Sequence, residues 1–123
     1  MDRVFFAIGS FSALAAVALG AFAAHGLRGK LSPELHAIFE VGARYHMYHA
    51  LGLLAVAWAS TRWPGSAVTA AGWLFVAGTI LFSGSLYLLS VTDHRWLGAI
   101  TPLGGLAFLL GWLALAWGCL AAR

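Results

Sequence analysis

Residues 32–51 read SPELHAIFEVGARYHMYHAL, and they set the architecture of the chain. Ser32, Pro33 and Glu34 predict a helix start, because a hydroxyl N-cap, an N-terminal proline and an early carboxylate all favour one. The stretch holds three of the five histidines and runs straight into an apolar segment. We therefore expect a helix whose polar groups lie at and below a membrane surface.

The composition indicates a membrane protein. Of 123 residues, 62% are hydrophobic and only 9% are charged, whereas a soluble domain carries about 25% charged residues. Four segments approach or exceed the roughly 20 apolar residues that cross a bilayer. The sequence thus predicts an all-α integral membrane protein, a single domain over 1–123 with four transmembrane helices at 4–24, 41–60, 67–90 and 101–122.

The second helix is too long for a simple span. From residue 33 to residue 60 it would measure about 42 Å at 1.5 Å per residue, against a hydrocarbon core of about 30 Å. We interpret residues 33–44 as an amphipathic interfacial lead-in to this helix, with Gly42 as a bend point. The last helix begins either near Leu97, with a kink at Pro102, or with Thr101 as its N-cap, which we favour.

The charges and the single cysteine exclude several classes. Seven Lys and Arg residues give a net charge of +3, but they are scattered over the helix ends, so we expect no nucleic-acid partner. Cys119 lies in the last apolar segment and is expected to be a small buried residue. We expect no metal and no cofactor.

Small residues recur at helical spacing in three of the helices. Such stripes let helix backbones approach closely in a membrane. In the last helix the stripe provides either internal packing or a dimer seam. The stripes are Gly9/Ala13/Ala16/Gly20/Ala23, then Ala70/Ala77/Gly84 beside Ala71/Gly78/Ser85, and finally Gly104/Ala107/Gly111/Ala114/Gly118/Ala121.

Four motifs in order, LGAFAAHGL (19–27), YxxxHAL (45–51), LFSGSLY (81–87) and ITPLGG (100–105), followed by Gly111-Trp112, are similar to a known family. They resemble the domain-of-unknown-function 423 family of small bacterial membrane proteins, related to the transmembrane-protein-256 group of eukaryotes. The resemblance implies a four-helix, multi-pass protein of the bacterial inner membrane and supplies no reaction. Ala23 and His46 depart from the family pattern, which has glycine and glutamine there, whereas His25 and His49 match it.

A polar stripe follows the start of the second helix. His36, Glu40, Arg44 and Tyr48 succeed one another at i+4. We favour a solvated interfacial face with an ordinary Glu40–Arg44 pair. The alternative is an edge that binds lipid headgroups or anions, which requires Arg44 to face the bundle.

His46 and His49 lie deeper, with His49 about 12 Å below residue 41 by helical rise. A histidine at that depth usually faces protein and bonds to a neighbour, and Tyr87, Ser83 and Ser85 are the expected partners. Metal or haem ligation and proton or substrate handling remain alternatives. The candidate polar site comprises Glu40, Arg44, Tyr45, His49, His25, Ser83, Ser85 and Tyr87.

No arrangement of catalytic residues stands out, so we expect a non-enzymatic protein with a structural, assembly or accessory role. Its partners would be membrane lipid and either copies of itself or other membrane proteins. The alternative function is a small homo-oligomeric transporter or channel whose path is lined by His49, Tyr45 and Arg44. A haem, quinone or metal-binding membrane protein is the class that the sequence favours least.

Overall fold

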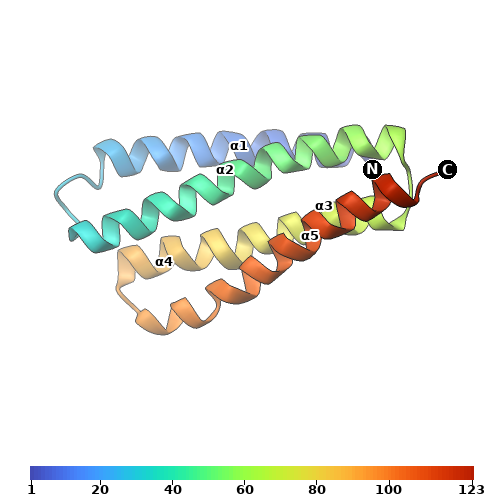
Figure 1. Cartoon of the computed structure of the whole chain (residues 1–123). Coiled ribbons are helices and arrows are strands. Elements are labelled where there is room, and N and C mark those ends of the chain that lie inside the picture. The colour runs from blue at the N-terminus through green and yellow to red at the C-terminus, as the bar shows by residue number, and fades with distance from the viewer.

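The computed structural model describes residues 1–123, and every regular element in it is helical. The elements are α1 (Asp2–His25), α2 (Pro33–Arg62), α3 (Ser66–Gly78), a π-helical turn η1 (Thr79–Ser83), α4 (Gly84–Thr92), a 3-10 helix η2 (Arg95–Ala99) and α5 (Thr101–Ala121). Because α3, η1 and α4 follow one another without a gap, they form one long helix, and the molecule is a bundle of four helices (Figure 1). The all-α prediction is confirmed.

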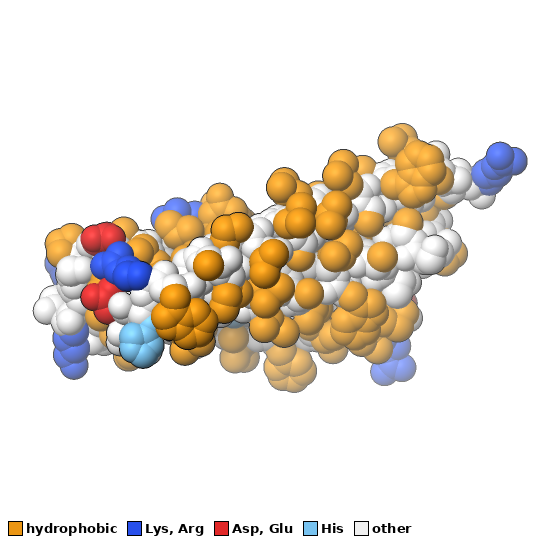
Figure 2. All heavy atoms as spheres, turned by 90° about the horizontal axis from the view of Figure 1, so that it is seen from below, with side chains coloured by type: hydrophobic (Ala, Val, Ile, Leu, Met, Phe, Trp, Pro, Cys, Tyr) orange, Lys and Arg blue, Asp and Glu red, His pale blue; other side chains and the backbone are white.

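The bundle is built from two antiparallel pairs, α1 with α2 and the long third helix with α5 (Figure 1). The chain termini and the 63–65 connection lie at one end, and the 26–32 and 93–100 connections lie at the other. Three helices are long and apolar enough to cross a membrane: Asp2–His25, Ser66–Thr92 and Arg95–Ala121. Hydrophobic side chains cover the middle of the body, and charged side chains gather towards its two ends (Figure 2).

Helix α2 begins as its sequence predicts. The Ser32 hydroxyl accepts a hydrogen bond from the Leu35 N–H at 3.2 Å, and Pro33 is the first helical residue. The helix then continues through Gly42 to Arg62 without interruption. Gly42 is a place of close approach, because a Cβ there would lie 3.1 Å from Cε1 of Tyr87. Residues 33–44 are therefore the first part of a single long helix.

The small-residue stripes make helix contacts inside the bundle. A Cβ on Gly9 of α1 would lie 2.9 Å from the Ala50 carbonyl oxygen of α2. On α5, a Cβ on Gly104 would overlap the backbone nitrogen of Phe82, and one on Gly111 would overlap the Phe75 ring. The α5 stripe therefore packs within the chain, against α3 and η1.

Two expectations about the last helix need correction. Thr101 is the first residue of α5 rather than a side-chain N-cap, because its hydroxyl lies 2.6 Å from that of Ser85 instead of capping the helix. Cys119 was expected to be buried, and this is wrong, because it is exposed. Its neighbour Gly118 is the residue that contacts the third helix, at Val68.

Candidate functional site

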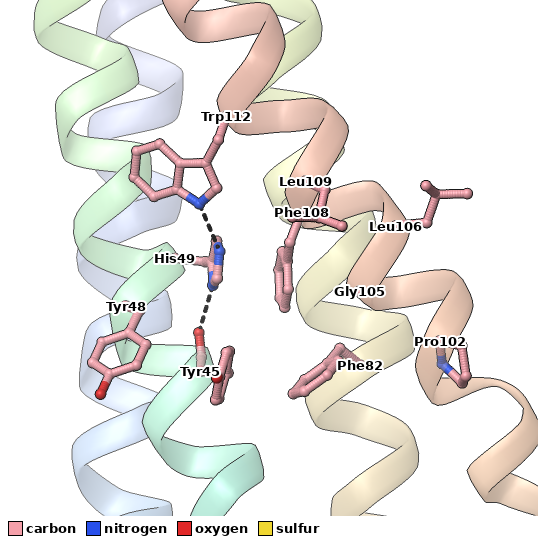
Figure 3. Close-up of a pocket in the computed structure, with 10 residues that line it drawn as sticks. All are labelled: Tyr45, Tyr48, His49, Phe82, Pro102, Gly105, Leu106, Phe108, Leu109 and Trp112. Carbon is pink, nitrogen blue, oxygen red and sulfur yellow. Dashed lines mark hydrogen bonds between the residues drawn. The ribbon is translucent and has the colours of Figure 1, made fainter.

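His49 lies where α2 meets α5, and both of its ring nitrogens are bonded (Figure 3). Nδ1 is 2.8 Å from the Tyr45 carbonyl oxygen, one helical turn earlier. The indole N–H of Trp112 donates to Nε2 at 3.1 Å. The imidazole also stacks on Phe108, with ring centroids 3.5 Å apart. His49 is thus held by one polar contact from each helix and by an aromatic face.

The chemistry of these partners fixes the state of the imidazole. An indole N–H only donates, so Nε2 must be the acceptor, and a carbonyl oxygen only accepts, so Nδ1 must carry the proton. A second proton on Nε2 would point at the N–H of Trp112 and break that bond. His49 is therefore neutral, and both of its ring nitrogens are occupied by hydrogen bonds within the bundle.

A groove of about 760 Å³ opens beside His49, between α2 and α5 (Figure 3). It lies between Tyr45 and Tyr48 on one helix and Leu106 and Leu109 on the other. Phe82 from the π-helical turn also lines it. Where Trp112 reaches across to His49 the two helices are tied together. The Trp112 N–H is bonded to His49 and is not available to an occupant. Apart from the two tyrosine hydroxyls, the walls therefore present apolar and aromatic surface.

His46, on a different side of α2, joins three helices. Its Nδ1 lies 2.9 Å from the Tyr87 hydroxyl of α4, and its Nε2 lies 2.9 Å from the Ser12 hydroxyl of α1. Each hydroxyl can donate or accept, so either tautomer of His46 satisfies both contacts. Tyr87 is thus the partner of His46, one of the pairings that the sequence suggested.

The two predicted serines have separate partners. Ser83 is buried and donates to the Gly42 carbonyl oxygen of α2 at 2.7 Å. Ser85 is also buried, and its hydroxyl faces that of Thr101 at the start of α5. Neither bonds to a histidine, so these hydroxyls link helices and do not extend the polar site.

The remaining candidates lie at one end of the bundle. Glu40 pairs with His36, at 2.8 Å between Oε1 and Nε2, rather than with Arg44 as expected. Arg44 is exposed and has no ion-pair partner, and His25 is exposed at the end of α1. No group of three or more His, Cys, Asp or Glu residues is placed to hold a metal ion.

Reasoning from the sequence missed Ser12, Phe108 and Trp112. Trp112 stood in a motif of the resemblance, next to Gly111, and a tryptophan inside an apolar helix needs an acceptor for its N–H. That requirement was the available signal. Ser12 and Phe108 carry no comparable signal, because serine and phenylalanine are ordinary residues in such helices.

The family model described as "Protein of unknown function (DUF423)" matches residues 19–105. The chain belongs to the DUF423 family. The UPF0382 membrane protein YwdK of Bacillus subtilis is 54% identical over 112 residues, covering 90% of this chain and 91% of YwdK. A UPF0382 membrane protein of Staphylococcus epidermidis is 50% identical over 113 residues, 92% of each chain. No solved structure gives a significant match.

These matches confirm the resemblance drawn from the motifs and establish a helical membrane protein. The DUF423 match takes in all of α2, so it includes Tyr45, His46 and His49. It ends at Gly105 and leaves Phe108 and Trp112 outside. In this DUF423 protein the groove is therefore formed partly by the family segment, which includes Pro102 and Gly105 of α5, and partly by the rest of α5.

Proposed function

We propose that this DUF423 protein is a non-enzymatic, multi-pass accessory protein of the bacterial cytoplasmic membrane that holds an apolar lipid chain between α2 and α5. The observation that carries the proposal is the groove beside His49. Its walls present aromatic and aliphatic surface, and the two ring N–H groups there, of Trp112 and His49, are already bonded. An occupant therefore gains binding free energy from its own apolar surface, because the groove interior leaves no unbonded N–H for a polar group of the occupant.

In the proposed arrangement all four helices span the bilayer. Helix α2 runs antiparallel to α1 and alongside it (Figure 1), so a membrane that α1 crosses encloses α2 as well. Eighteen residues separate Arg44 from Arg62 on α2, about 27 Å by helical rise. That distance is close to the thickness of the hydrocarbon core, about 30 Å. Residues 33–43 would then project through the headgroup region.

The groove would face the lipid phase directly. Its α2 wall, Tyr45 to His49, begins one residue inside Arg44, the charged residue that marks the proposed boundary. Tyrosine is enriched at this level of membrane proteins because its ring is apolar and its hydroxyl is polar. A lipid chain could therefore enter from the side, with its polar end at the tyrosines and its tail towards Trp112.

The other functions considered from the sequence receive less support. The proposed path residues do not share a polar cavity, because Arg44 is exposed and His49 uses both nitrogens within the bundle. For the same reason, His49 could ligate a haem iron only after losing the bond from Trp112 or the bond to Tyr45. The groove is apolar, which fits a lipid chain better than an ion path.

The test fills the groove from within. Gly105 lines it, and a Cβ there would lie 3.9 Å from Phe82, an ordinary contact, so Gly105→Leu can place its side chain in the cavity. Gly20→Leu is the matched control, because Gly20 on α1 has open space around it. Native mass spectrometry of protein incubated with phosphatidylcholine should show bound lipid on the wild type and on Gly20→Leu, and much less on Gly105→Leu. Equal retention by the two variants would refute the proposal.

A further inference from the structure

Each of the four acidic side chains of the chain lies against a basic group of the chain. Glu34 and Asp93 both pair with Arg95, at 2.7 and 2.6 Å. Glu40 pairs with His36, and Asp2 lies 3.9 Å from the N-terminal amine. Because the chain has only four acidic residues, its other cations have no side-chain ion-pair partner. Arg28 and Arg44 are among those without a partner.

These two arginines line the same hollow. It has a volume of about 640 Å³ and lies between the 26–32 connection and the first half of α2. Leu31, Ala37 and Val41 contribute apolar surface to it, and Glu40, the one carboxylate there, is already paired with His36. The hollow therefore carries two guanidinium groups without an ion-pair partner against a single carboxylate, so its net charge is positive.

The hollow and the apolar groove are lined by successive turns of α2. Arg44 precedes Tyr45 directly and lies one helical turn, about 6 Å of rise, before Tyr48. Both tyrosines line the groove. Along α2 an unpaired cation is thus followed by the apolar groove. A membrane lipid has the matching order, with an anionic phosphate followed by an apolar chain.

We propose that Arg28 and Arg44 bind the phosphate of an anionic phospholipid whose chain occupies the groove between α2 and α5. This inference rests on the proposed function and names the ligand class of that groove. A guanidinium suits a phosphate because its parallel N–H groups reach two oxygens at once. A zwitterionic headgroup would add an ammonium beside two arginines, where the one carboxylate, Glu40, is already bonded to His36. The site therefore selects a net-negative headgroup.

The experiment compares two lipids with identical chains. The protein is incubated with equimolar phosphatidylglycerol and phosphatidylcholine in detergent, and native mass spectrometry reports the ratio of the bound lipids. The wild type should prefer phosphatidylglycerol. Each arginine removed should lower that preference about fivefold, the amount expected for one cation near an anionic lipid surface. The double variant Arg28→Gln/Arg44→Gln should then show almost no preference.

The control is Arg62→Gln, which removes an arginine at the opposite end of the same helix. It should keep the wild-type ratio, and a loss equal to that of the double variant would overturn the proposal. Since Arg28 and Arg44 make no ion pair, the double variant should also keep the thermal unfolding temperature of the wild type. A wild type that binds both lipids equally would likewise overturn the inference.

Two further arms separate the sources of phosphate and the two halves of the site. Excess inorganic phosphate should leave phosphatidylglycerol bound, when compared with chloride at equal ionic strength, and full displacement would indicate a soluble-anion site instead. Gly105→Leu should reduce both lipids without changing their ratio. An unchanged amount of lipid on Gly105→Leu would remove the groove as the seat of the chain, whereas an unchanged ratio in the arginine variant would remove only the headgroup site.

Discussion

Trp112 donates its indole N–H to Nε2 of His49 across the interface of α5 and α2, at 3.1 Å. Helix α5 otherwise packs mainly on α3 and η1. This bond therefore joins α5 to α2 at the end of the groove. It also fixes the imidazole as the Nδ1–H tautomer, because the only partner of Nδ1 is a carbonyl oxygen.

Replacing Trp112 by phenylalanine should keep a ring against Phe75 and leave Nε2 of His49 without a donor. We expect the free energy of unfolding in detergent to fall by about 1 kcal/mol, as for the loss of an interhelical hydrogen bond. Trp117→Phe is the control, because Trp117 is 65% exposed and should tolerate the change. Equal stability of the two variants would mean that the bond does not hold α5 to α2.

His46 should tolerate glutamine better than leucine. Glutamine has a donor and an acceptor, so it can keep a bond to Ser12 or to Tyr87, whereas leucine leaves both hydroxyls unpaired. The leucine variant should be less stable than the glutamine variant by about 1 kcal/mol in denaturant unfolding. Adding Ser12→Ala to His46→Leu should then cost little, since that contact is already lost. A full additive cost would contradict the bonded arrangement.

Neighbouring glycines on α5 should respond in opposite ways to alanine. A Cβ at Gly104 would overlap the Phe82 backbone nitrogen, whereas one at Gly105 would lie 3.9 Å from the Phe82 ring. Gly104→Ala should therefore force α5 away from η1 and lower the free energy of unfolding by about 1–3 kcal/mol. Gly105→Ala should be neutral or slightly stabilising. Thermal unfolding of the purified variants measures both, and similar melting temperatures would argue against this close approach.

Four spans and three spans predict different labelling patterns. In a Cys119→Ala background, single cysteines at Lys30, Ser66 and His94 can be labelled in intact cells with a membrane-impermeant maleimide. If α2 crosses the membrane, Lys30→Cys and His94→Cys react from the same side and Ser66→Cys reacts from the other. If α2 does not cross, Lys30→Cys and Ser66→Cys react from the same side. The first pattern is expected.

The helices themselves could be predicted because their signals are local. An apolar run predicted a helix over 67–90, and the structure has one continuous helix from Ser66 to Thr92. Ser32 and Pro33 marked the start of α2 correctly for the same reason. Such signals act within a few residues of one another and need no knowledge of what packs against them.

The contacts between helices could not be predicted in the same way. Glu40 has a possible hydrogen-bond donor four residues before it and another four residues after it, so spacing alone does not choose between His36 and Arg44. The depth of His46 in its helix predicted that it faces protein, but not that Ser12 of α1 would meet it. The π-helical turn was also missed, because nothing in the residue types of 79–83 differs from an ordinary apolar helix.

The π-helical turn constrains the number of residues in the third helix. Each residue in an α-helix rotates the chain by about 100°, and the π-helical turn adjusts this rotation between Gly78, which packs on α5, and Tyr87, which meets α2. Loss of one residue between 79 and 83 would swing Tyr87 away from His46 while leaving Gly78 in place. Substitutions along this helix can therefore be accommodated. A single-residue insertion or deletion there would instead prevent Gly78 and Tyr87 from facing α5 and α2 at the same time.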